Sequence, residues 1–434
     1  MCFSITFSGY AQHQDSTFGP RQLQIHVSSA RNSFAFHHPR RPSLVSFAWT
    51  KPTIMSHDRL FQPLKLGHLE LSHRIIMAPL TRFRADDQNV PIDIVKDYYA
   101  QRASVPGTLL ITEATFISPQ ASGFNNVPGI WSDAQVAAWK EVTDAVHSKG
   151  SFIYLQLWAL GRVAVPKNLQ RQKGGPYPVV SSSVVPVSEG GHAPKAMTHG
   201  EIKSFVQDYA QAAKNAIAAG FDGVEIHGAN GYLIDQYWQD VCNKRTDEYG
   251  GSIERRARFG LEVTRAVIEA IGDSKKVGIR LSPWSDFQGM MMEDPVPQFL
   301  HIVKELKKLD LAYLHLVESR LIGDSATGIY HAVTRENDAL VDEWADSAPL
   351  VLAGGFTPAK ARKVVSEIYT GDNVCIAFGR HFISTPDLPF RLQKGIEFNP
   401  YDRATFYKKM SPDGFTDYPY SQEWLSVQKN ETKL

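Results

Sequence analysis

The sequence predicts an α/β fold, a TIM (β/α)8 barrel with a short N-terminal β-hairpin and an inserted lid between the third and fourth barrel strands. From Leu60 onward, short apolar runs alternate with longer amphipathic segments, which is the pattern of strands followed by helices. Polar residues end nearly every apolar run, and a parallel barrel brings all of its strand ends to one mouth. A doubly wound sheet also alternates strands with helices, but it does not predict polar residues at nearly every strand end.

The expected elements follow from these runs. About eight strands are predicted, at residues 74–79, 108–115, 151–158, 223–229, 277–282, 312–318, 350–354 and 375–379. The helix-like segments between them are residues 92–103, 133–148, 201–219, 253–271, 297–308, 358–368 and 386–394. Thr357-Pro358 and Thr385-Pro386 are predicted helix starts, because threonine caps a helix and proline lacks an N–H that the first turn leaves unpaired anyway.

Length, charge and cysteine content narrow the class of protein. The 434 residues are enough for a large core, and the formal net charge of +1 gives no sign of a nucleic-acid partner. No run of about 18 apolar residues predicts a membrane span. Cys2, Cys242 and Cys375 are far apart, so neither a metal site nor a disulfide framework is indicated. We expect a cytoplasmic protein that acts on small molecules, as a monomer or homodimer.

Residues 1–54 differ in composition from the rest of the chain. They carry five cationic side chains but only one acid, Asp15, together with many Ser, His and Phe residues. Two interpretations stay open: a transit peptide, which would make the location mitochondrial, or a disordered extension or upstream start in the gene model ahead of Met55. In either case residues 55–434 are expected to form the single functional domain.

The stretch 220–237 carries the strongest chemical signal. An apolar run from Gly223 ends in His227, Asn230 and Tyr232, with glycines between them. Two hydrogen-bond donors on one carbonyl oxygen stabilise the negative charge that grows there when a conjugated position is attacked. A phenol with a pKa of about 10 is protonated at neutral pH and is able to deliver a proton. Taken singly, each residue has a structural alternative: a core histidine, a turn asparagine and a packed tyrosine.

Two late strand ends have the character of a phosphate site. Gly354-Gly355 follows the seventh run, and Gly379-Arg380 follows the eighth. Backbone N–H groups and an arginine fork bind phosphate at this position in such barrels. Arg280 ends a different strand and is expected elsewhere on the same cofactor. A planar, electron-accepting ring with a phosphate tail suits this arrangement.

These residues resemble those of a known family. From about Leu60 to Trp424 the chain resembles the Old Yellow Enzyme family of FMN-dependent ene-reductases, and its fungal members in particular. The matching motifs are Ala78-Pro79-Leu80-Thr81-Arg82, Thr112-Glu113-Ala114, Gln156-Leu157-Trp158, His227-Gly228-Ala229-Asn230-Gly231-Tyr232, Tyr249-Gly250-Gly251-Ser252, Arg280-Leu281-Ser282-Pro283, Gly379-Arg380, Ile383-Ser384, Tyr401-Asp402-Arg403 and Phe406-Tyr407. They cover nearly the whole barrel in the same order.

The resemblance implies a role for each matching position. The implied FMN ligands are Pro79, Leu80, Thr81, Ala114, Gln156, Arg280, Gly354, Gly355, Gly379 and Arg380. Within this set, the Thr81 hydroxyl is implied to bond the flavin O4 and to count among the catalytic groups, and Arg280 to lie near N1 and O2. His227 and Asn230 are implied to hold the substrate oxygen, and Tyr232 to protonate the α-carbon. The remaining pocket residues are Trp158, Phe287 and Tyr407.

Two positions depart from the family pattern. Many relatives have Asn where this chain has Gly355, and Gly where it has Ala114. A side-chain contact to the cofactor is therefore absent at Gly355 or replaced by backbone. Residues 161–198 are too long for a simple loop and are expected to form a lid or hairpin over the substrate. Residues 288–297 hold three consecutive methionines and resemble an adaptable rim.

The function implied is that of an NADPH dehydrogenase or ene-reductase with tightly bound, non-covalent FMN. NADPH reduces the flavin, and an α,β-unsaturated aldehyde, ketone or nitroalkene then takes hydride from N5 in a ping-pong cycle. One alternative is a secondary-metabolite enzyme on the same barrel, an ergot-alkaloid-like aldehyde reductase or isomerase. A binding protein that has lost FMN, and a metal-dependent hydrolase, are alternatives from other classes. The retained set of Thr81, Gln156, Arg280 and Arg380 argues against the first of these. The lack of a His and carboxylate cluster at the predicted strand ends argues against the second.

Overall fold

Eight parallel strands close into a barrel in the computed structural model, which describes residues 58–318 and 336–431. In chain order they are β3 (Ile75–Met77), β4 (Leu109–Ile111), β6 (Phe152–Trp158), β9 (Gly223–Gly228), β10 (Val277–Leu281), β11 (Tyr313–Val317), β12 (Leu350–Ala353) and β13 (Val374–Phe378). Each pairs in parallel with its neighbours, and the β13–β3 pairing completes the ring. The predicted barrel is confirmed. The predicted extension, residues 1–54, lies outside the described residues.

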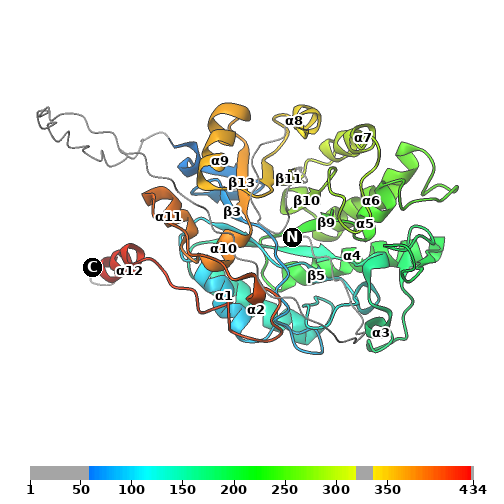
Figure 1. Ribbon diagram of the computed structural model, residues 1–434, viewed down its shortest axis with the longest axis horizontal. Helices are drawn as coiled ribbons and strands as arrows, with labels where there is room; N and C mark the ends of the chain where they lie inside the picture. Colours follow the sequence, from blue (N-terminus) through cyan, green and yellow to red (C-terminus); the bar gives the residue numbers. More distant parts are fainter. Residues whose placement is uncertain (1–57, 319–335, 432–434) are drawn as a thin grey trace, which may run out of the picture. The chain divides into compact units, whose positions relative to one another are not determined.

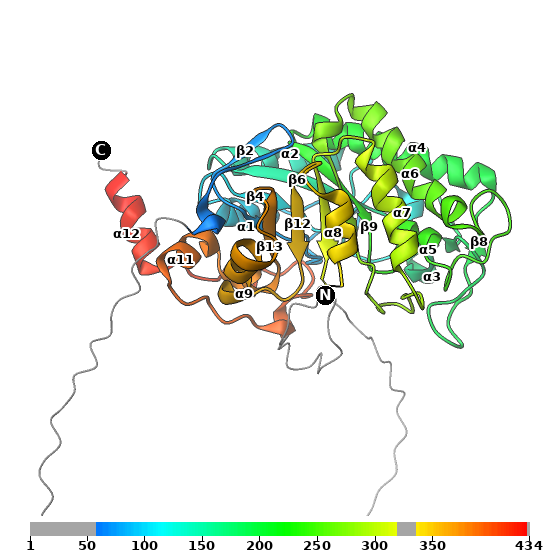
Figure 2. The same cartoon turned by 90° about the horizontal axis from the view of Figure 1, so that it is seen from above.

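The helices surround the strands. They include α1 (Ile94–Arg102), α2 (Asp133–His147), α4 (His199–Ala218), α6 (Ile253–Ile271), α7 (Val296–Lys307), α8 (Asp338–Trp344), α9 (Pro358–Lys363) and α11 (Leu388–Lys394). Figure 1 and Figure 2 show them outside the strands. Capping boxes at Ser132 and Thr198 fix the starts of α2 and α4. None of the helices in the described part of the chain is long and apolar enough to cross a membrane.

An antiparallel hairpin covers one end of the barrel. It consists of β1 (Leu64–Leu66) and β2 (Leu69–Leu71), with Leu64 opposite Leu71. Its buried leucines pack against inward-facing residues such as Tyr313. This confirms the predicted N-terminal hairpin and leaves the carboxyl ends of the strands as the open mouth.

One close packing contact explains how large side chains fit inside the ring. A Cβ atom at Gly278 would lie 2.3 Å from the Tyr313 ring, so only glycine lets that ring cross β10. The ring is fully buried. The interior is therefore filled by side chains, as the fold requires.

Two predicted elements are each divided into two in the structure. The second predicted strand is divided into β4 and β5 (Thr115–Phe116). Between them, the Thr112 hydroxyl accepts the backbone N–H of Gln156 at 3.1 Å, and this bond replaces a regular backbone bond between the strands. The predicted helix over residues 358–368 is α9 followed by a π-helical turn, η5 (Val364–Ile368). Thr357 caps α9 as predicted, accepting the Lys360 N–H at 3.3 Å.

Thr385 does not start a helix, so that prediction is wrong. The chain forms a separate short helix, α10 (Arg380–Ser384), and then reaches α11 with Asp387 at its N-cap position. The Thr385 hydroxyl instead accepts the backbone N–H of Asn399 at 3.1 Å. It joins α10 to the C-terminal segment, a tertiary contact that local sequence cannot reveal.

The insertion between β6 and β9 is not a hairpin. It contains α3 (Pro166–Leu169), β7 (Val180–Ser181) and β8 (Lys195–Ala196), and the two strands pair in parallel. Arg162, at its start, donates to the carbonyl oxygens of Gln288 and Gly289 at 2.8 and 3.2 Å. The insertion is thereby joined to the methionine-rich segment after β10.

The remaining elements are short or terminal. They are η1 (Arg59–Phe61), η2 (Pro119–Ala121), η3 (Gly161–Val163), α5 (Leu233–Trp238), η4 (Ser274–Lys276), η6 (Arg403–Thr405) and α12 (Gln422–Glu431).

Candidate functional site

Three aromatic side chains meet at the carboxyl ends of β6 and β9. The His227 ring centroid lies 5.0 Å from that of Tyr232 and 6.2 Å from that of Trp158, nearly parallel to the indole. The Tyr232 and Trp158 rings are perpendicular at 4.7 Å. Three of the predicted residues therefore form one cluster, although two strands and a loop supply them.

Asn230 holds a left-handed backbone conformation between His227 and Tyr232. Its φ is +57°, which asparagine tolerates better than most residues. Its N–H donates to the Ser282 hydroxyl at 2.7 Å, and its carbonyl accepts from the Gln288 amide at 3.2 Å. Among the described residues, none bonds its side-chain amide. That amide is thus available to a ligand.

Two buried side chains of α5 fix the next residue, Gly231. Asp235 accepts the Gly231 N–H at 2.8 Å, and Gln236 donates to the Gly231 carbonyl at 2.7 Å. Gln236 also donates to the Leu160 carbonyl, and it accepts the Arg162 N–H. Both side chains are fully buried. The loop that carries Asn230 and Tyr232 is therefore held on both sides, a contact that the sequence analysis missed.

A row of rings links Trp158 to Tyr407, two predicted pocket residues that are far apart in sequence. The centroid distances are 5.9 Å from Trp158 to Phe124, 6.4 Å from Phe124 to Phe83, and 5.5 Å from Phe83 to Tyr407. Sequence reasoning missed Phe83 and Phe124, because aromatic residues in loops carry no periodic signal. The positive φ of Phe83, +58°, is the structural sign of a special position.

Phe287, the remaining predicted pocket residue, lies on the segment after β10. Its carbonyl oxygen would be 3.0 Å from a Cβ atom at Gly231, so the two backbones are adjacent. Phe287 is partly exposed, which suits a residue at the rim of a pocket.

His227 is uncharged at neutral pH. Burial lowers the pKa of its imidazole well below the ordinary value, and the positive charge of Arg280 beside it acts in the same direction. Arg280 is the register partner of His227 on β10. Among the described residues, no group bonds Nδ1 of this imidazole. A neutral imidazole donates one hydrogen bond, as the predicted contact with a substrate oxygen requires.

Gln156 lies two residues before Trp158 on β6, and Arg280 is level with His227 on β10. Gln156 donates from Nε2 to the buried carboxylate of Glu225 at 2.7 Å. Arg280 is paired in register with His227 on one side and with His315 on the other. Sequence reasoning did not single out Glu225 or His315, because each lies within an apolar strand pattern that is typical of packing.

The first and last strands bring the predicted flavin-lining residues together. Leu80 and Thr81 follow β3, and a Cβ atom at Gly379 would lie 3.4 Å from the Leu80 side chain. Pro79 precedes Leu80 in the same buried segment. Ala114 joins β4 to β5 and packs with Trp158. Within the described chain, no hydrogen bond engages the Thr81 hydroxyl.

The predicted phosphate end is formed by two glycine turns. Gly354 has a φ of +147°, and a Cβ atom there would lie 2.7 Å from the Glu318 side chain, so a larger residue does not fit. In the described structure, no backbone hydrogen bond uses the N–H groups of Gly355 or Phe356. The guanidinium carbon of Arg380 lies 5.5 Å from the Tyr401 ring centroid. Backbone N–H donors and an arginine that packs on a tyrosine ring are thus present at the predicted phosphate end of the site.

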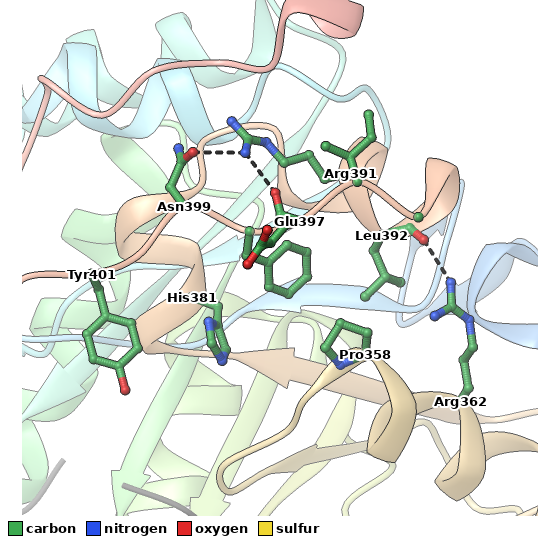
Figure 3. A pocket seen from close by; sticks show the side chains of 11 residues that line it. Pro358, Arg362, His381, Arg391, Leu392, Glu397, Asn399 and Tyr401 are labelled. Carbon is green, nitrogen blue, oxygen red and sulfur yellow. Dashed lines mark hydrogen bonds between the residues drawn. The ribbon is translucent and has the colours of Figure 1, made fainter. Parts of the chain in front are cut away.

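A cavity of about 520 Å³ lies beside this end. His381 and Tyr401 are among its lining residues (Figure 3). The two arginines that line it are already engaged: Arg391 donates to Glu397 and Asn399 at 2.9 and 2.8 Å, and Arg362 donates to the Leu392 carbonyl at 2.7 Å. The Arg391 bonds hold the segment after α11 against that helix, and the Arg362 bond joins α9 to α11.

The donor set fits a flavin that carries a phosphate. The ring end offers the side chains of Thr81, Gln156 and Arg280. The tail end offers glycine segments with N–H groups that no backbone carbonyl of the described residues accepts. The indole N–H of Trp158 is buried with no partner in the described part of the chain, which also marks this mouth as a ligand site. The family resemblance and the geometry therefore point to the same cofactor.

Comparisons with known proteins agree with the geometry. Residues 59–399 match the NADH:flavin oxidoreductase / NADH oxidase family. The chain is 56% identical over 366 residues to a chanoclavine-I aldehyde reductase of Penicillium roqueforti, covering 84% of this chain and 97% of that protein. It is 54% identical over 375 residues to an NADP-dependent oxidoreductase of Aspergillus flavus, covering 85% and 98%. The solved structure of an Old Yellow Enzyme from Pichia sp. matches with a TM-score of 0.76 and 41% identity, covering 84% and 94%.

Proposed function

We propose that this chain, which belongs to the Old Yellow Enzyme family of FMN oxidoreductases, is an ene-reductase. Its substrates are α,β-unsaturated aldehydes, ketones or nitroalkenes, its reductant is NADPH, and residues 55–434 act as its single functional domain. The observation that carries the proposal is the cluster of His227, Tyr232 and Trp158 next to Asn230, whose side-chain amide makes no hydrogen bond to another described residue. Bound FMN supplies the redox chemistry, accepting hydride from a nicotinamide and passing it on from N5.

His227 and Asn230 bind the oxygen that activates the substrate. An activated alkene gains negative charge on its carbonyl or nitro oxygen as hydride reaches the β-carbon. A neutral imidazole N–H and an amide N–H stabilise that charge without adding a fixed charge of their own. The same two donors hold the carboxamide oxygen of a nicotinamide, so both half-reactions depend on them.

Tyr232 supplies the proton that completes the reduction. Its ring packs edge-on against Trp158 and His227, so its position is fixed by two neighbours. The phenol O–H donates to the α-carbon, and the phenolate that remains takes a proton from solvent. Phe287, Trp158 and Tyr407 shape the apolar part of the pocket.

The cofactor is held by groups at both ends of the mouth. Thr81, Gln156 and Arg280 bind the ring, with Pro79, Leu80 and Ala114 packed along it. Gly354, Gly355, Gly379 and Arg380 bind the phosphate through backbone N–H groups and one guanidinium.

The proposal is tested by the visible spectrum of the purified protein under anaerobic conditions. A flavin band is expected that bleaches with NADPH and returns when 2-cyclohexenone is added. If NADH bleaches the flavin band and NADPH does not, the assigned reductant is contradicted. A protein that remains colourless after incubation with FMN would contradict the cofactor site.

A second candidate function is a narrower aldehyde-acting enzyme of secondary metabolism, a reductase or an isomerase. The 56% identity to a chanoclavine-I aldehyde reductase favours it. It is distinguished by reoxidation with a panel of enals and enones: a bleached protein that an indole-bearing enal reoxidises, and cyclohexenone does not, supports the narrower function.

A further inference from the structure

A buried carboxylate, Glu225, lies inside the barrel below the candidate site. It is two residues before His227 on β9, so both side chains are on the same face of the strand. Its side chain is fully buried. The mechanism proposed above does not use it, yet a buried carboxylate requires compensating partners.

Three side chains from two other strands donate to Glu225. Gln156 donates to Oε1 at 2.7 Å, and Tyr313 donates its hydroxyl to Oε2 at 3.0 Å. His315 Nδ1 lies 2.7 Å from Oε2. Strands β6 and β11 thus reach the same group on β9, and Gly278 leaves the space through which the Tyr313 ring does so.

Glu225 is ionised within this network. Burial alone would raise the pKa of its carboxyl, but His315, the charge of Arg280 and the Gln156 bond together hold that pKa below its ordinary value. Burial lowers the pKa of His315, so its imidazole is neutral and donates from Nδ1. Arg280 is therefore a cation whose charge favours the ionised form of Glu225.

The carboxylate determines which way the Gln156 amide faces. An ionised carboxylate only accepts hydrogen bonds, so Gln156 must direct its NH2 group toward Glu225. The amide oxygen then remains for a ligand. The pyrimidine edge of a flavin has an N–H donor that matches a carbonyl acceptor and not a second donor.

The Glu225 carboxylate also interacts electrostatically with the positive charge of Arg280. A cation beside a flavin favours its reduction, because reduction adds electron density to the ring. A carboxylate that attracts the same cation opposes this effect in a low-dielectric interior. We propose that Glu225 is a positioning residue that orients the Gln156 amide and offsets the Arg280 charge, and so lowers the reduction potential of the bound flavin.

This inference rests on the proposed FMN site and is tested with three variants of the full-length holoprotein. Glu225→Gln removes the charge, and Glu225→Asp keeps the charge but shortens the reach to Gln156. Glu262→Gln is the matched control, since Glu262 also accepts a tyrosine hydroxyl, that of Tyr249 at 2.9 Å, but lies on α6 outside the barrel. The readouts are the midpoint potential of the bound flavin and the FMN affinity of the apoprotein.

Glu225→Gln is expected to raise the midpoint potential and to weaken FMN binding about tenfold, the effect of one misdirected hydrogen bond. Glu225→Asp is expected to keep the potential while losing affinity, and it remains informative if the Gln variant does not fold. An unmoved or lowered potential in Glu225→Gln, or unchanged FMN affinity in both variants, would overturn this inference alone. A wild-type protein that binds no flavin would overturn the proposed function with it.

Discussion

Gly231 donates its backbone N–H to the buried carboxylate of Asp235 at 2.8 Å, and this bond fixes the chain between Asn230 and Tyr232. Gln236 completes the contact by donating to the Gly231 carbonyl at 2.7 Å. A helix of the scaffold therefore sets the position of two groups proposed to act on the substrate. Positions held in this way are more accurate than those of free loops, and small displacements lower the rate.

Gln236→Met is expected to reduce activity by moving this loop. The substitution keeps the volume of the side chain but removes its donors to Leu160 and Gly231, at a cost of about 2–4 kcal/mol of unfolding free energy. The rate of flavin reoxidation by an enone is expected to fall about tenfold. Stopped-flow absorbance at saturating substrate measures this rate.

Gln298→Met is the control for that experiment. Gln298 is also fully buried, accepting from Arg256 at 2.9 Å and donating to the Ile253 carbonyl at 3.1 Å, but it lies on α7. A similar loss of stability is expected, with the reoxidation rate retained. Equal loss of rate in both variants would show that general destabilisation is responsible.

Phe124→Leu is expected to weaken substrate binding. The Phe124 ring bridges Trp158 and Phe83, so its removal opens the aromatic row on one side of the pocket. Loss of such a contact is worth about 1 kcal/mol, or roughly a fivefold rise in KM for a cyclic enone. Phe221→Leu, which removes a ring packed on Trp139 outside the barrel, serves as the comparison. An unchanged KM in Phe124→Leu would remove this residue from the pocket.

The stability of the fold is expected to fall at acid pH because of His73. Its Nδ1 accepts the Ile75 N–H at 3.2 Å, and its Nε2 bonds the Thr108 hydroxyl at 3.0 Å. Burial lowers the pKa of His73 to about 4, below the value of 6.5 expected in the unfolded chain. The unfolded state therefore binds more protons between these values, and stability is lost as pH falls from 6.5 to 4, by up to about 3 kcal/mol.

Urea unfolding at pH 7 and at pH 4.5 measures this effect. His73→Asn keeps one acceptor and one donor but does not titrate in this range, so its stability should depend less on pH. If both proteins lose the same stability between the two pH values, other groups are responsible.

The strand pattern was enough to predict the barrel. Residues 253–271 were predicted as a helix, and α6 has the same limits, because its apolar spacing and its Ser252 cap agree. The predicted end of the second strand and the predicted start of α11 were wrong. At both places a threonine hydroxyl, that of Thr112 or Thr385, bonds the backbone of a distant residue, and the local sequence does not reveal such a contact.

The candidate site was partly predictable. His227 and Tyr232 come from one motif, and the fold brings them together with Trp158 as expected. Phe124 and Glu225 were not predicted, since their significance depends on which strands become neighbours. The sequence of one strand does not reveal a hydrogen-bond network, such as that of Glu225, that connects three strands.

The most direct test of the proposed mechanism compares the two half-reactions in Tyr232→Phe. Flavin reduction by NADPH and flavin reoxidation by 2-cyclohexenone are each followed by anaerobic stopped-flow absorbance. The variant retains the ring that packs on Trp158 but loses the proton donor. Reduction is expected to proceed at the wild-type rate, while reoxidation slows by about a hundredfold or more. An equal fall in both rates, or no fall in reoxidation, would contradict the assignment of Tyr232 as the proton donor.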